Sequence, residues 1–138
     1  MKKIKQTLTI SFELRRTPRN KKTNQIITAN DTLNRFERAA IVKRLRRLSK
    51  AKTLEAMTLN NITEHITDVD IIIKQTRFDN RTRDAMNLAP TFKALIDGMT
   101  DADIWEDDND DIINAITVER STFEKTDKTI NIKMILKF

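Results

Sequence analysis

The chain has 138 residues, of which 38% are hydrophobic and 33% charged, and its formal net charge is +6. This length predicts a single domain over residues 1–138. The chain has no cysteine and one glycine, which excludes disulfides, thiolate metal sites and glycine-rich phosphate loops. It also lacks an apolar run of about eighteen residues, so we expect no transmembrane helix and no membrane partner. The absence of cysteine fits a cytoplasmic protein.

The charge is unevenly distributed along the chain. Residues 1–56 hold 16 Lys and Arg against 4 Asp and Glu, whereas residues 101–111 hold 7 acidic residues and no basic one. A basic half favours a polyanion partner, because Lys and Arg contacts to phosphate give sequence-independent, salt-dependent affinity. The alternative interpretation is that the charge only keeps the protein in solution.

The first half of the chain predicts a strand, a basic loop and a helix. Residues 7–14 alternate apolar and polar side chains, which is the period of a half-buried strand. Residues 15–30 are polar and basic, and we expect a mobile loop or arm there. Asn30 or Asp31 can cap a helix over about residues 32–56.

The second half predicts another strand, a helix and two more strands. Residues 68–77 are β-branched and apolar, and Pro90 suits the first turn of a helix. Residues at helical spacing form one apolar face on this helix: Phe92, Leu95, Ile96 and Met99. Residues 112–120 and 129–138 are expected to form a hairpin. The order β-α-β-α-β-β predicts an α+β (mixed α/β) domain in which a sheet packs against helices.

The acidic stretch over residues 101–111, "DADIWEDDNDD", is predicted to be a loop around the only tryptophan, Trp105. It is not a calcium-binding EF-hand loop, because a loop starting at Asp107 would need Gly at Ile112 and Glu at Val118. Two interpretations remain open, a solvated acidic face and part of a Mg²⁺ site built from oxygen ligands. Trp105 is expected to anchor the loop in the core.

Other polar residues precede this loop at regular spacing. Asp84 and Asn87 follow the second predicted strand, and Lys93 and Asp97 lie one helical turn apart. Lys93 and Asp97 are compatible with an ordinary i, i+4 ion pair. If the chain folds back at both ends of the helix, Asp84 can meet Asp108.

Three blocks, "RDAMN", "KALIDGM" and "WEDD", lie in this order within residues 81–120. Their combination resembles the RusA family of Holliday junction resolvases, which are small phage-borne endodeoxyribonucleases. The resemblance implies a Mg²⁺-dependent homodimer, with Mn²⁺ as a possible substitute, that binds four-way DNA junctions and nicks two strands symmetrically.

The resemblance also implies roles for individual residues. By position, Asp84 and Asp108 would be metal-binding catalytic acids, Asp107 a neighbouring metal ligand and Lys93 the essential lysine. Asn87 would offer an additional oxygen ligand. The family pattern D-x-D-N has a second Asp where this chain has Met86, and the residues that can supply the missing oxygen are Asp79, Glu106 and Asp107.

The departure at Met86 leaves an alternative open, a junction-binding protein without catalysis. A third interpretation places the acidic face against a basic protein partner. Under the nuclease interpretation, basic residues hold the DNA backbone: Arg15, Arg16, Arg19, Lys21, Lys22, Arg81 and Arg83.

Overall fold

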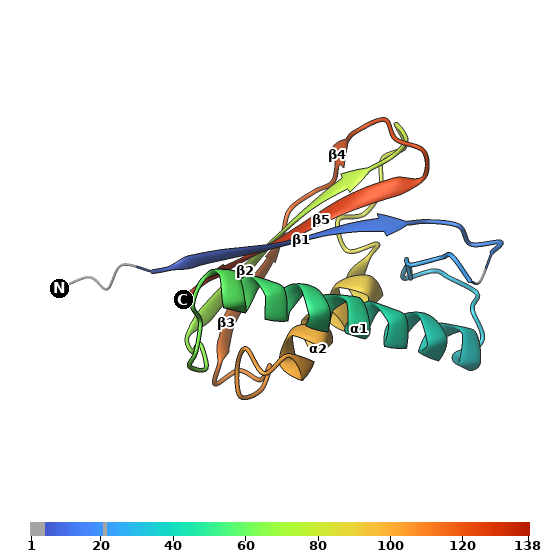
Figure 1. Ribbon diagram of the computed structural model, residues 1–138. Helices are drawn as coiled ribbons and strands as arrows, with labels where there is room; N and C mark the ends of the chain where they lie inside the picture. Colours follow the sequence, from blue (N-terminus) through green and yellow to red (C-terminus); the bar gives the residue numbers. More distant parts are fainter. Residues whose placement is uncertain (1–4, 21) are drawn as a thin grey trace.

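A mixed β-sheet and a layer of helices make up the computed structural model, which describes residues 5–20 and 22–138 (Figure 1). The elements in chain order are β1 (Thr7–Arg15), α1 (Arg35–Leu59), β2 (Val69–Arg77), α2 (Ala89–Asp101), β3 (Ile113–Val118), β4 (Thr122–Phe123) and β5 (Thr129–Lys137). The predicted α+β class is confirmed, and the two-residue strand β4 is an addition to the predicted order. Among the described residues, no helix is long and apolar enough to cross a membrane.

The strand order in the sheet is β1-β5-β2-β3. Strand β5 is antiparallel to both β1 and β2, whereas β3 is parallel to β2. The predicted hairpin of residues 112–120 and 129–138 is therefore wrong, because β2 lies between β3 and β5. A parallel neighbour needs a long crossover, and α2 with the acidic loop provides it between β2 and β3.

The core lies between the sheet and the helices. Alternate residues of β1 and β5 are buried, and the others on these strands are exposed or half-buried. The predicted apolar face of α2 is confirmed, since Phe92, Leu95, Ile96 and Met99 are all buried. Both layers therefore follow the period of their sequence, two residues for strands and about 3.6 for the helix.

Helices α1 and α2 approach closely at Gly98, the only glycine of the chain. A Cβ atom on Gly98 would lie 2.5 Å from the Ser49 Cβ and 2.6 Å from the Arg46 carbonyl oxygen. The Ser49 hydroxyl donates a hydrogen bond of 2.5 Å to the Leu95 carbonyl oxygen in the same place. Glycine is needed here for close approach rather than for backbone conformation.

Helix α1 begins later than predicted. Its N-cap is Asn34, whose side-chain oxygen accepts a hydrogen bond of 2.9 Å from the Glu37 amide. The predicted cap Asp31 instead accepts a hydrogen bond of 2.7 Å from the Thr28 amide and closes a turn in the preceding loop. Both side chains satisfy a backbone donor, but only Asn34 does so at a helix end.

The basic loop over residues 15–30 is not a free arm, because residues 24 and 26–28 are buried. Thr91 of α2 exchanges two hydrogen bonds of 2.8 Å with the backbone of Ile27. Arg44 of α1 donates a hydrogen bond of 2.9 Å to the Lys22 carbonyl oxygen. The predicted DNA contact Lys21 lies outside the described residues.

Candidate functional site

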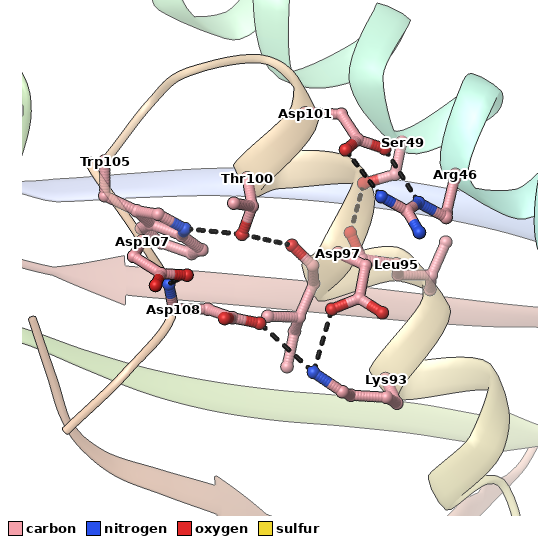
Figure 2. Close-up of polar contacts among 11 residues, drawn as sticks. Arg46, Ser49, Lys93, Leu95, Asp97, Thr100, Asp101, Trp105, Asp107 and Asp108 are labelled. Carbon is pink, nitrogen blue, oxygen red and sulfur yellow. Dashed lines mark hydrogen bonds and ion pairs between the residues drawn. The ribbon is translucent and has the colours of Figure 1, made fainter.

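The acidic loop after α2 is anchored by Trp105, which is completely buried. Its indole nitrogen donates a hydrogen bond of 2.8 Å to the Thr100 hydroxyl, which in turn donates 3.3 Å to the Ile96 carbonyl oxygen (Figure 2). Ile104 beside it is also completely buried. The predicted role of Trp105 as a core anchor is confirmed, and it fixes where the loop leaves α2.

Lys93 lies between two carboxylates, one on α2 and one on the acidic loop. Its Nζ atom is 2.8 Å from Asp97 Oδ1 and 3.2 Å from Asp108 Oδ2, as Figure 2 shows. Asp97 is one turn along the same helix, whereas Asp108 arrives from the loop. The i, i+4 pair expected from the sequence is confirmed, and the structure adds Asp108 as a third member of this carboxylate–lysine cluster of Lys93, Asp97 and Asp108.

These contacts change the ionisation of the cluster. The hydrogen bond to Asp97 raises the pKa of Lys93 most, and the bond to Asp108 adds to it, although desolvation acts in the opposite direction. Desolvation raises the pKa of Asp108, but hydrogen bonds, chiefly from Lys93, outweigh it and hold the pKa below its usual 3.8. Both groups are therefore charged at neutral pH.

Asp107 shapes the backbone at the tip of the loop. Its Oδ1 accepts a hydrogen bond of 2.8 Å from the Asp108 amide, and its Oδ2 accepts 3.4 Å from the Asn109 side chain. The carboxylate is exposed, while Asp108 is half-buried. Asp107 therefore orients Asp108 and still faces solvent.

Asp101 and Asp103, which we expected to be solvated charge, are both exposed, and each also pairs with a residue far away in the sequence. Asp101 receives two hydrogen bonds of 2.8 and 2.7 Å from the Arg46 guanidinium of α1. Asp103 lies 2.9 Å from the ring of His65, the only histidine. These pairs tie the start of the loop to the middle of α1 and to the segment that follows α1.

Asp84 does not join the carboxylate–lysine cluster. Its Oδ1 accepts a hydrogen bond of 2.9 Å from the Met86 amide, a turn that Asp side chains commonly form. Within residues 5–20 and 22–138, it makes no hydrogen bond or ion pair with Lys93, Asp107 or Asp108. Asn87 is half-buried, and its backbone carbonyl oxygen accepts a hydrogen bond of 2.8 Å from the Ala29 amide. The proposed pairing of Asp84 with Asp108 remains a prediction.

The carboxylates near Lys93 meet some of the requirements of a Mg²⁺ site. In the part of the chain that the structure describes, no three acidic or histidine side chains are grouped as metal ligands. However, Asp97 and Asp108 already converge on one positive charge, and Mg²⁺ commonly takes only one or two protein carboxylates. Asp108 and its neighbour Asp107 are the acids best placed to hold it.

The predicted DNA contacts fall into paired and exposed groups. Arg15 is 3.7 Å from Asp127, and Arg16 is 3.4 Å from Asp31. Arg83 makes a bidentate ion pair with Asp79, with N–O distances of 2.5 and 2.8 Å. Three further side chains are exposed: Arg19, Lys22 and Arg81.

Sequence reasoning missed functional candidates on both sides of this region. Asp97 was treated only as an ion-pair partner of Lys93, and its spacing was the available signal. Arg77, at the end of β2, lines a cavity together with Arg16, and the available signal was its place in a segment with Arg81 and Arg83. No protein-family model and no curated protein matches this chain.

Proposed function

We propose that the protein is a Mg²⁺-dependent endodeoxyribonuclease that resolves four-way DNA junctions by paired nicking as a homodimer. The carboxylate–lysine cluster of Lys93, Asp97 and Asp108 supports this best. Lys93 is held by Asp97 of the same helix and by Asp108 of a loop that a buried tryptophan anchors, and this arrangement has the charges and the rigid support that phosphodiester hydrolysis requires.

Each residue has a defined task in this proposal. Asp108, with Asp107 beside it, would hold the Mg²⁺ ion, which when bound supplies charge neutralisation at phosphate and an activated water. Lys93 would direct its ammonium group at a phosphate oxygen while Asp97 keeps it in place. The positive charge of residues 1–56 would hold the DNA backbone, which a shape-selective enzyme contacts more than the bases.

A junction-binding protein without cleavage is the second candidate. It is favoured by Met86, which is 49% exposed where the family pattern has an acid, and by the absence of contact between Asp84 and Asp108 among the described residues. Both candidates share the DNA-binding half of the molecule and differ only in the carboxylate site.

Cleavage of a synthetic four-way junction with Mg²⁺, and with EDTA as the metal-free control, separates the two. Lys93→Ala is expected to reduce the cleavage rate by about 100-fold or more, a typical loss when one charge-stabilising group is removed. Asp108→Asn is expected to abolish cleavage and retain junction binding. Lys133→Ala, an exposed lysine of β5, is the matched control for loss of one positive charge.

The outcomes are distinct. Cleavage by Asp108→Asn at the wild-type rate would contradict the site assignment. Tight binding by the wild-type protein with no product in Mg²⁺ or Mn²⁺ would favour the second candidate. Failure to bind any DNA at low salt would reject both.

A further inference from the structure

A cavity of about 460 Å³ lies at the end of the sheet, away from the carboxylate–lysine cluster. It is lined by the start of the basic loop, the end of β2, the loop before α2, and Ser121 before β4. Figure 1 shows β4 beside the end of β2. The volume is in the range of small-molecule sites, and neither Lys93 nor any acid of the loop lines it.

The charges that line this arginine pocket are strongly unbalanced. Four arginines line it, namely Arg16, Arg77, Arg81 and Arg83, and its only acidic lining residue is Asp79. Asp79 is fully engaged by Arg83, because each of its oxygens accepts a bond from that guanidinium. Asp31, which does not line the pocket, accepts a hydrogen bond of 3.4 Å from Arg16, and only the Nη2 atom of Arg16 takes part. The pocket therefore retains positive charge that the protein does not neutralise.

Arg16 and Arg77 also carry buried nitrogen atoms without hydrogen-bond partners. These are Nη1 of Arg16 and Nε of Arg77. Arg77 Nη1 donates 2.6 Å to the Ser121 carbonyl oxygen and 3.3 Å to its hydroxyl, which are both neutral acceptors. Within the described residues, Arg77 has no carboxylate partner. Unpaired buried donors on a cation are costly, and both belong to guanidinium groups that line this pocket. An anion in the pocket would offset the cost by neutralising these groups.

A phosphate group matches these donors better than other anions. Guanidinium groups present forked N–H donors that fit the oxygens of phosphate, and several can share one tetrahedral ion. A single carboxylate would leave more of the arginine charge uncompensated. The partly enclosed wall, which includes the buried Thr28 and Gln75, would also strengthen the attraction by limiting water.

We propose that the arginine pocket is a phosphate-binding site in which Arg16 and Arg77 hold the phosphate and Arg81 closes its rim. The phosphate can come from the backbone of DNA or from a free phosphate or mononucleotide, and the chemistry of recognition is the same. This site does not require the proposed nuclease activity, because it shares no residue with the carboxylate–lysine cluster.

Isothermal titration calorimetry with inorganic phosphate at low ionic strength tests the site directly. We expect saturable binding to the wild-type protein and a loss of about tenfold or more in affinity for Arg77→Gln, the value of one charged hydrogen-bonding group. Lys133→Gln, an exposed lysine of β5 outside the pocket lining, is the control for loss of one positive charge and should bind phosphate as the wild type does. Asp108→Asn should also bind normally, which separates this site from the nuclease proposal.

Two competition experiments identify the source of the phosphate. A short oligonucleotide without terminal phosphates that displaces inorganic phosphate identifies the DNA backbone, whereas displacement only by a deoxymononucleotide identifies a free ligand. If Arg77→Gln does not fold by circular dichroism, Arg16→Gln carries the same comparison. Absence of phosphate binding, or equal affinity in the wild type and the folded variant, would overturn the proposal.

Discussion

Asp79 is the acid whose ionisation the structure perturbs most clearly. The two hydrogen bonds from Arg83 are the main cause that lowers its pKa from 3.8 to about 2, against the effect of burial, and the Arg81 amide adds a smaller contribution. A carboxylate with a lowered pKa in the folded state stabilises the fold above its unfolded pKa. That contribution disappears as the pH falls through the folded pKa.

The variant Asp79→Asn tests this contribution to stability. Above about pH 5 it should have a free energy of unfolding about 1 kcal/mol lower than the wild type, a modest value because the pair is partly exposed. This difference should shrink between pH 4 and pH 2, as the wild-type carboxylate is protonated. Urea unfolding at a series of pH values measures it. Asp110→Asn in the acidic loop is the control, and a difference that stays constant with pH would contradict the role of the ion pair.

Met86 provides a test of the candidate metal site at one residue. Its side chain is 49% exposed, so Met86→Asp should fold without burying a charge. If Asp84 contributes to a Mg²⁺ site, the added carboxylate should increase junction cleavage about tenfold or more and lower the Mg²⁺ concentration at half-maximal rate. Met86→Asn is the matched control without charge. Equal rates and equal Mg²⁺ dependence in all three proteins would exclude Asp84 from the site.

Gly98 controls the packing of the helices, which is the main contact between elements outside the sheet. Gly98→Ala should destabilise the protein by about 1–2 kcal/mol, because the clash with Ser49 and Arg46 costs more than the gain in helix propensity. Chemical denaturation measures the change. Ala51→Gly on the exposed side of α1 gives the propensity contribution alone. A more stable Gly98→Ala variant would mean that the helices can separate at little cost.

The period of each element was predictable from the sequence, but its neighbours were not. Alternation identified β1 and β5 because each buries one face, and the spacing of Phe92 to Met99 identified the buried face of α2. The hairpin prediction failed because the insertion of β2 between β3 and β5 leaves no trace in the period of either strand. The start of α1 was missed because Asp31 and Asn34 both have side chains that can cap a helix.

The candidate site was predictable to the same degree. The pairing of Lys93 with Asp97 follows from helical spacing. Asp108 was singled out only by the resemblance of the block "WEDD" to the family pattern, and its contact with Lys93 was not predicted. The pairing of Asp101 with Arg46 depends on a contact across 55 residues, and the burial of the Arg77 Nε atom depends on several segments, which no local pattern encodes. Long-range packing decides which of many similar charges become paired.

At the scale of the whole molecule, positive charge lies on several surfaces that differ in their expected role. Lys43, Arg47 and Lys50 line a shallow groove on α1 beside Asp101. Lys74 and Lys133 are paired across β2 and β5, and they point to the sheet face opposite the helices. If DNA lies along the helix side, where the carboxylate–lysine cluster is, only the first group should contact phosphates.

The salt dependence of junction binding tests this arrangement. The logarithm of the binding constant should fall linearly with the logarithm of salt concentration, with a slope of about −0.9 per phosphate contact. Arg47→Gln and Lys50→Gln should each reduce the steepness by about 1, because each removes one phosphate contact and the counterion that it displaces. Lys133→Gln removes the same charge from the opposite face and should leave the slope unchanged. Fluorescence anisotropy of a labelled junction at several salt concentrations gives the slopes, and equal reductions in all three variants would mean that net charge rather than a defined face binds DNA.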